Sequence, residues 1–256
     1  MLSDLRPSKD RDIKVIATIE ARMASSRLPG KVLLPALGQP LLSHLVNRLK
    51  AVSQVDQIVL ATTTNEEDNE LEVFATDIDI HCYRGSEKDV MKRVICAAES
   101  TGADVLVEIT ADCPIIDPQI VGQAVSTFRS NKVDYLGNTV VRSYPDGMDV
   151  QVLSLNALKR SASMTKNAVD REHVTLHIRN NPDLFSHLNL VAPPELFWPD
   201  LGLTLDEEAD YELLTRIIQY FGPNQLLFSC LEVVQLLKEN PDWVLINQSV
   251  ERKGAT

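Results

Sequence analysis

The first half of the chain alternates short apolar runs with amphipathic, helix-like segments. The runs are rich in β-branched residues and lie at residues 13–19, 58–61, 80–83 and 105–109. Strands that alternate with helices in this way are typical of a parallel sheet. Runs that are almost continuously apolar also indicate strands that are covered on both faces. We therefore predict a Rossmann-like α/β fold, in which a mostly parallel sheet lies between two helical layers.

The pattern changes after residue 130. Further strands are predicted at residues 134–137, 150–153, 184–191 and 201–205, and further helices at residues 155–162, 170–179, 207–220 and 231–239. We interpret residues 134–198 as a small β/α insertion that provides a dimer surface. No linker is long enough to require a second domain. We predict one domain over residues 13–256, preceded by a flexible N-terminal arm of residues 1–12.

The charge balance speaks against nucleic acid as the main partner. The chain of 256 residues has a formal net charge of −11, whereas a protein that neutralises many phosphates usually has a basic face. The four cysteines lack Cys-x-x-Cys spacing, so neither a zinc site nor a disulfide framework is indicated. Residues 1–11 have no apolar signal region, and no apolar run approaches the roughly 20 residues that span a bilayer. A cytoplasmic enzyme without membrane contact is expected.

A cationic loop follows the first predicted strand. Residues 21–31 read Ala-Arg-Met-Ala-Ser-Ser-Arg-Leu-Pro-Gly-Lys and contain the cations Arg22, Arg27 and Lys31. Open α/β sheets bind phosphorylated ligands at the ends of their strands, and small residues let the main chain approach phosphates. The spacing matches neither a Walker A loop nor a dinucleotide-binding loop. The loop therefore predicts a phosphate-binding site, and its alternative is a surface loop with solvated cations.

Two aspartates follow apolar strands and are candidate ligands for a metal ion. Asp112 comes just after residues 105–109, and Asp206 just after residues 201–205. Mg²⁺ prefers hard oxygen ligands and often shares its shell with phosphates. The alternative for each is a helix cap, although Asp117, directly before Pro118, suits that role better than Asp112.

Other polar residues could line a binding site. Arg142, Tyr144, Asp146 and Asp149 are clustered, although Tyr-Pro-Asp-Gly is also a favourable turn sequence. We predict that a helix begins with Arg171, Glu172 and His173, at the edge of the sheet where ligands bind. The alternative for His173 is a satisfied core or interface histidine. We predict that Thr63 and Arg84, at the ends of the second and third strands, line a pocket for a nucleotide base.

Six segments taken together resemble the cytidylyltransferases that make CMP-activated acidic sugars. The group includes CMP-N-acetylneuraminate synthetase and 3-deoxy-manno-octulosonate cytidylyltransferase, and the likeness is closest to spore-coat polysaccharide cytidylyltransferase-like proteins. The segments that carry the resemblance are residues 21–31, 84–90, 109–114, 144–147, 171–175 and 203–206. The likeness extends over residues 13–245.

The resemblance implies a nucleotidyltransferase sheet and transfer of CMP from CTP to an acceptor, with Mg²⁺ and release of pyrophosphate. It implies that Arg22 and Lys31 bind the triphosphate and offset charge during the reaction, and that Asp112 and Asp206 hold Mg²⁺. A homodimer is expected. In-line nucleotidyl transfer fits these residues, because it needs positioning and charge neutralisation rather than a nucleophilic side chain.

The same resemblance assigns the remaining groups. Arg27 would assist at the phosphates, and the main chain near Ala21 would face cytidine together with Ser26. Independently of the resemblance, polar residues within the insertion are the candidates for acceptor binding: Arg142, Tyr144, Asp146, Asp149, Arg171, Glu172 and His173.

Two departures from the relatives bear on the acceptor and the metal. Residues 206–210 read Asp-Glu-Glu-Ala-Asp where many relatives have Asp-Thr-Pro-Glu-Asp, so the leading aspartate is retained without the proline. Thr110 and Ala111 stand near the position where sialate synthetases commonly have glutamine, which weakens an assignment to sialic acid. Acceptors that remain open are acidic sugars and molecules bearing phosphonate or phosphate. A glycosyltransferase using a nucleotide-sugar and a non-catalytic subunit are the alternative functions.

Overall fold

A seven-stranded sheet forms the centre of the computed structural model, which describes residues 13–252. Its strand order is β5-β4-β1-β6-β8-β7-β9, and β8 is antiparallel to both of its neighbours while the other pairs are parallel. The strands are β1 (Val15–Glu20), β4 (Gln57–Thr63), β5 (His81–Gly85), β6 (Val105–Thr110), β7 (Tyr135–Gly137), β8 (Gln151–Ser154) and β9 (His187–Asn189). The predicted α/β fold with a mostly parallel sheet is confirmed. A separate small hairpin consists of β2 (Pro35–Ala36) and β3 (Gln39–Pro40).

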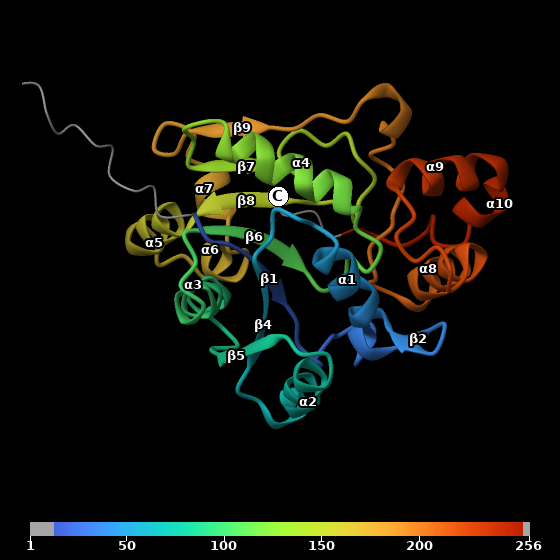
Figure 1. The fold of residues 1–256 in the computed structure, drawn as a ribbon, viewed down its shortest axis with the longest axis horizontal. Helices are drawn as coiled ribbons and strands as arrows, with labels where there is room; N and C mark the ends of the chain where they lie inside the picture. Colours follow the sequence, from blue (N-terminus) through green and yellow to red (C-terminus); the bar gives the residue numbers. More distant parts are fainter. Residues whose placement is uncertain (1–12, 253–256) are drawn as a thin grey trace, which may run out of the picture.

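Helices cover both faces of the sheet (Figure 1). One face carries α1 (Leu41–Lys50), α2 (Asn69–Asp77), α4 (Pro118–Arg129), α8 (Glu208–Phe221) and α9 (Cys230–Glu239). The other carries α3 (Val90–Ser100), α5 (Leu155–Met164) and α7 (Leu176–Arg179). The short helices α6 (Ala168–Glu172) and α10 (Pro241–Val244) complete the set in the described residues.

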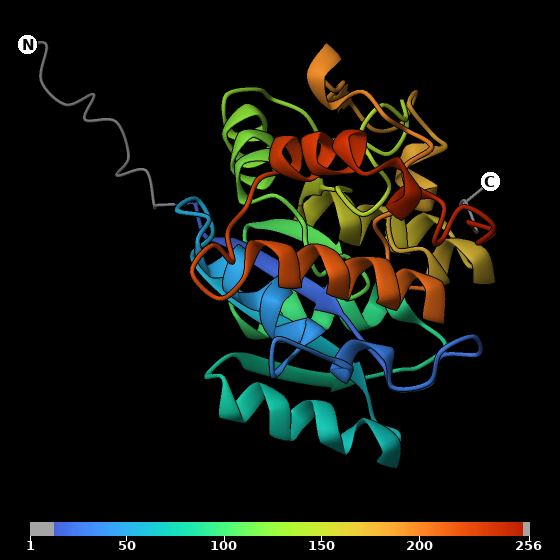
Figure 2. The ribbon, with the colours of Figure 1, turned by 90° about the vertical axis from the view of Figure 1, so that its right-hand side faces the viewer.

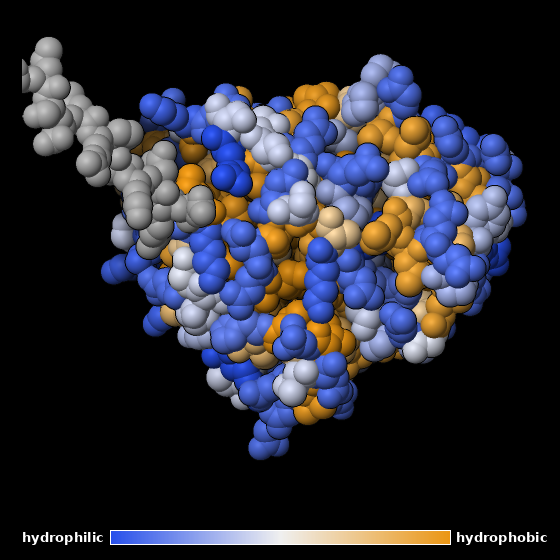
Figure 3. Space-filling model, in the orientation of Figure 1, coloured by the Kyte–Doolittle hydropathy of each residue, from blue (hydrophilic) through white to orange (hydrophobic). Residues whose placement is uncertain are grey.

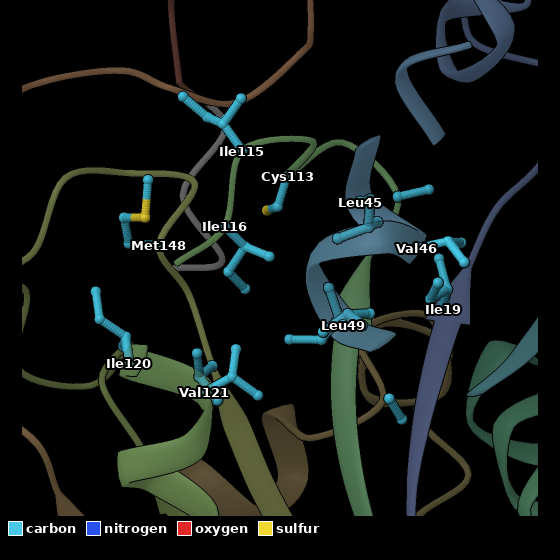
Figure 4. Packing of buried hydrophobic residues seen from close by; sticks show 14 of the residues in the cluster. Ile19, Leu45, Val46, Leu49, Cys113, Ile115, Ile116, Ile120, Val121 and Met148 are labelled. Atoms are coloured by element: carbon cyan, nitrogen blue, oxygen red, sulfur yellow. The ribbon is translucent and has the colours of Figure 1, made fainter. Parts of the chain in front are cut away.

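Successive side chains along a strand pack into two different hydrophobic cores, one on each face of the sheet. In β1, Ala17 and Ile19 join the core under α1, whereas Ile16 joins the core under α3, as the two-residue period of a strand requires. Figure 4 shows Leu49 of α1 and Val121 of α4 in the same core as Ile19. Both faces of β1 are therefore buried, which explains why its sequence is largely apolar up to Ile19.

Polar residues cover much of the face drawn in Figure 3, and apolar residues show between them. Among residues 13–252, no helix combines the length and apolar character that a membrane span requires. The predicted arm of residues 1–12 lies outside the described residues. Residues 134–198 contribute β7, β8 and β9, which extend the main sheet beyond β6.

Two predicted elements are wrong. Residues 201–205 are buried and extended, but they form no sheet strand because their main chain pairs with other loops: Asp146 bridges Gly202, and the amide of Leu205 donates to the carbonyl of Asp112. The predicted helix over residues 170–179 is broken between α6 and α7. The break is at Val174, whose φ of 25° places its side chain in the core at the expense of helical geometry.

Candidate active site

A cavity of about 650 Å³ opens at the carboxyl ends of β1 and β6. Open α/β sheets bind their ligands at this edge. Its walls come from the loop after β1, the loop between β5 and α3, the end of β6, α6 and Asp206. The predicted site residues that line it are Ala21, Arg22, Ser26, Arg27, Lys31, Asp112, Glu172, His173 and Asp206. The structure therefore brings together the cationic loop, both metal-ligand candidates and two of the acceptor candidates.

The Lys31 ammonium lies between the two aspartates. Its nitrogen is 3.0 Å from Oδ1 of Asp206 and 3.7 Å from Oδ2 of Asp112, and it donates a hydrogen bond to the carbonyl of Leu205. Gly30 sets this position, because its φ of 69° ends the loop in the left-handed region just before Lys31. The ammonium marks a place where a positive charge is held by two carboxylates.

The two arginines of the loop differ in their surroundings. Arg27 is 3.0 Å from Oδ1 of Asp206 and 3.1 Å from Oε1 of Glu207, so it shares an acidic partner with Lys31. Arg22 has about half of its side chain exposed and is 3.7 Å from Oε1 of Glu87. Exposed pairs of this kind contribute little to stability, so Arg22 can turn to an anionic ligand at small cost.

Asp206 is not the N-cap of α8, so the alternative of a helix-capping role is wrong for this residue. The N-cap is Glu207, and Asp210 accepts hydrogen bonds from the amides of Asp206 and Glu207 at 3.0 and 2.9 Å. The Asp206 carboxylate is left facing Lys31 and Arg27. Asp117 caps α4 as predicted, since its side chain accepts from the amide of Gln119.

Arg171 does not line the cavity. Its guanidinium makes two hydrogen bonds to Asp89, at 2.6 and 2.9 Å, and one to the carbonyl of Ala162. Asp89 is the N-cap of α3, so this pair joins α6 to the start of α3 and fixes the turn that carries Glu172 and His173. The sequence does not separate Arg171 from its two neighbours, because Asp89, the carboxylate that holds Arg171, is 82 positions away.

Thr63 and Arg84 also lie outside the cavity lining. The Thr63 hydroxyl donates to Asp68, and the Arg84 guanidinium donates to the carbonyls of Thr63 and Asn65. Arg84 is also paired with Glu72 at 2.8 Å. The contacts in the structure therefore tie the ends of β4 and β5 together.

The four candidates in residues 142–149 are not among the residues that line the cavity. Tyr144 is buried in the core, and Arg142 is 3.6 Å from Oδ1 of Asp146. Burial, together with the neighbouring Asp146 carboxylate, raises the pKa of Asp149 from 3.8 to about 7. The main chain of residues 142–149 pairs with residues 201–205, so it supports the extended segment from which Asp206 projects.

Asp149 makes stability depend on pH. Its pKa is raised from 3.8 to about 7 on folding, so its contribution is complete below 3.8 and is lost as the pH rises to about 7. We expect Asp149→Asn to raise Tm by about 5–10 °C more at pH 8 than at pH 5. Differential scanning calorimetry at the two pH values measures this, and an equal Tm shift at both would contradict it.

Sequence reading missed a pair of buried acids beside the cavity. Glu20 ends β1 and lines the cavity, and Glu108 lies in β6, where it accepts a hydrogen bond from Gln151. Burial raises the pKa of Glu20 well above its usual range, and the adjacent Glu108 raises it further. The available signal was Glu108 itself, a charged residue in the middle of an otherwise apolar run.

Comparison with known proteins identifies the family. A family model described as cytidylyltransferase matches residues 16–248. The chain belongs to the cytidylyltransferase family. A solved cytidylyltransferase structure from Leptospira borgpetersenii is 31% identical, with a TM-score of 0.87, and the match covers 94% of this chain and 100% of that one.

Two proteins with similar sequences show which members of the family this cytidylyltransferase resembles. The spore coat polysaccharide biosynthesis protein SpsF of Bacillus subtilis is 33% identical over 233 residues, which cover 89% of this chain and 95% of the relative. A 3-deoxy-manno-octulosonate cytidylyltransferase of Geobacter metallireducens is 24% identical over 170 residues, covering 66% and 62%. The resemblance found in the sequence is confirmed, and the protein is a CTP-dependent nucleotidyltransferase.

The donor set in the cavity of this cytidylyltransferase suits a hard cation. Asp112 and Asp206 offer carboxylate oxygens to one point, which the Lys31 ammonium now marks. In residues 13–252, no group of three or more histidine, cysteine, aspartate or glutamate side chains could hold a metal ion. A cation here would therefore need further ligands from substrate phosphates or water, as is usual for Mg²⁺.

Proposed function

We propose that this cytidylyltransferase transfers CMP from CTP to a small acidic sugar, with Mg²⁺ bound by Asp112 and Asp206. The observation that carries the proposal is the Lys31 ammonium between these two carboxylates, within a cavity that also contains Arg22 and Arg27. Two further cations beside a carboxylate pair suit a triphosphate, which brings more negative charge than the single phosphodiester of a product. The acidic-sugar class follows from the similarity to 3-deoxy-manno-octulosonate cytidylyltransferases.

The reaction forms a bond between an acceptor oxygen and the α-phosphorus of CTP. The bond from that phosphorus to the bridging oxygen breaks, pyrophosphate leaves, and the acceptor hydroxyl loses its proton to water. Lys31 and Arg22 would hold the triphosphate and offset the charge that develops in the transition state. When bound, Mg²⁺ supplies further charge neutralisation and can lower the pKa of a bound oxygen.

Acceptor recognition would use other polar residues that line the cavity. Glu172 ends α6, His173 is its C-cap, and both line the cavity together with Arg93 of α3. These side chains offer acceptors and donors of hydrogen bonds to sugar hydroxyls and to a carboxylate. An acceptor bearing phosphonate or phosphate would use the same cations. A glycosyltransferase is the second candidate, but the cluster of three cations suits a triphosphate better than a nucleotide-sugar.

Pyrophosphate release from CTP tests the proposal. Keto-deoxy sugar acids, nonulosonic acids and small phosphonates are supplied in turn, with Mg²⁺, and nucleotide products are separated by chromatography. We expect pyrophosphate and a CMP-acceptor in equal amounts with at least one sugar acid. Consumption of a nucleotide-sugar without pyrophosphate would instead establish the glycosyltransferase.

We also propose a homodimer formed through residues 134–198. Exposed apolar side chains in this segment include Val140, Val141 and Val191. Exposed apolar side chains within one segment are candidates for a contact between proteins. Sedimentation equilibrium should give twice the chain mass, and a monomer at micromolar concentration would contradict the proposal.

A further inference from the structure

The last described residues return to the acidic end of the cavity. The Arg252 guanidinium is 2.7 Å from Oδ1 of Asp210 and donates to the hydroxyl of Thr204 at 2.8 Å. One position earlier, the carbonyl of Glu251 accepts a hydrogen bond from Arg27 of the cationic loop at 3.1 Å. Figure 2 shows the red C-terminal segment on the side of the molecule where the dark blue loop after β1 lies. Three segments distant in sequence therefore meet beside Asp206.

Asp210 connects this C-terminal contact to Asp206. Its side chain is fully buried, and its two oxygens have different partners. Oδ2 accepts from the amides of Asp206 and Glu207, whereas Oδ1 accepts from Arg252 and from the side chain of Asn247. A buried carboxylate needs a compensating charge, and Arg252 supplies it. Loss of that charge would disturb the carboxylate that holds the Asp206 main chain.

The chain leaves room for the guanidinium at Gly202. A Cβ at this position would lie 2.0 Å from Nη2 of Arg252. The clash would be with the end of a flexible side chain, and the φ of Gly202 is not in the left-handed region. Alanine at Gly202 would therefore displace Arg252 while leaving the charge of the protein unchanged.

We propose that Arg252 is a positioning residue for the metal-binding carboxylate, acting through Asp210 on Asp206. The C-terminal segment is thereby part of the active site, although Arg252 itself lies outside the cavity lining. The inference rests on the proposed function, because it takes Asp206 as a ligand of Mg²⁺. Partners that orient metal ligands typically change metal affinity by about 10- to 100-fold when they are removed.

Arg252→Ala is the first test. We expect the Mg²⁺ concentration for half-maximal activity to rise by about 10-fold or more, with little change in KM for the acceptor. Binding of Mn²⁺ to the complex with CTP, followed by electron paramagnetic resonance, should weaken by the same factor. Arg252→Lys should recover part of the loss, because it restores the charge but not both hydrogen bonds.

Gly202→Ala is the second, independent test, and it decides the matter if Arg252→Ala fails to fold. It should give the same weakening of Mn²⁺ binding. Arg216→Gln is the matched control, because it breaks a surface ion pair with Glu212 on α8, the helix that also carries Asp210. This variant should bind Mn²⁺ like the parent protein.

The two failures can be told apart. If both variants lose Tm but bind Mn²⁺ normally, Arg252 is a purely structural residue and the inference is overturned. If Asp206→Asn also leaves Mn²⁺ binding to the CTP complex unchanged, Asp206 is not a metal ligand. The proposed metal site is then wrong, whatever the role of Arg252.

Discussion

Replacing Lys31 by alanine should lower kcat/KM for CTP by about 10³-fold. Lys31 lies at the centre of the cavity, within 4 Å of both aspartates, and only 14% of its side chain is exposed. A preorganised donor in such a site stabilises charge in the transition state more than a solvated one, because water does not screen it. Steady-state kinetics with pyrophosphate detection measure the loss, and it should appear mainly in kcat.

Lys31→Arg is the informative companion, because it keeps the charge but changes its shape. We expect partial activity from it, since a planar guanidinium can bind phosphate but does not fit the point held by Asp112 and Asp206. Lys50→Ala is the control, because Lys50 is exposed and contacts the carbonyl of Ile78 far from the loop. Activity of Lys31→Ala within about threefold of the parent would contradict a role for this cation in catalysis.

Asp206→Asn should abolish most of the activity as well, with an expected loss of about 10³-fold, and Asp112→Asn should behave similarly. Asn keeps the shape of the side chain but removes the charge that a hard cation requires. Asp206 also neutralises two cations, since Lys31 and Arg27 both lie 3.0 Å from its Oδ1. Its amide variant should therefore lose some stability together with its activity.

The metal dependence distinguishes a lost ligand from a damaged fold. Raising Mg²⁺ should recover part of the activity of each variant, and circular dichroism should show a native spectrum. Asp183→Asn, in an exposed loop, is the matched control and should retain full activity. Full activity of Asp206→Asn at low Mg²⁺ would remove this residue from the site.

Local sequence patterns were sufficient to predict the parts of the fold that depend on near neighbours. Apolar periodicity identified β1, β4 and β6, and it identified α1 from its leucine spacing. The cationic loop was recognisable because its cations, its small residues and its Pro-Gly turn are contiguous. Strand ends in a parallel sheet share one edge, so the meeting of Lys31 with Asp112 followed from the topology alone.

Other parts depend on partners distant in the sequence, and these were missed. Residues 201–205 have the composition of a strand, but their hydrogen bonds go to Asp112 and Asp146 in loops. Arg171 and Glu172 are adjacent and both charged. Arg171 forms an ion pair with Asp89 and does not line the cavity, whereas Glu172 does. No local pattern records which carboxylate an arginine will reach.

The convergence of Lys31, Asp112 and Asp206 is tested most directly by Mn²⁺ binding with and without CTP, followed by electron paramagnetic resonance. Without CTP the Lys31 ammonium occupies the point between the carboxylates, so we expect weak binding of Mn²⁺. With CTP present, the phosphates add ligands and give Lys31 a new partner, so affinity should rise by at least about 10-fold. Lys31→Ala should bind Mn²⁺ more tightly than the parent protein when CTP is absent. Equal Mn²⁺ affinity in all of these states would contradict a shared site for the triphosphate and its cation.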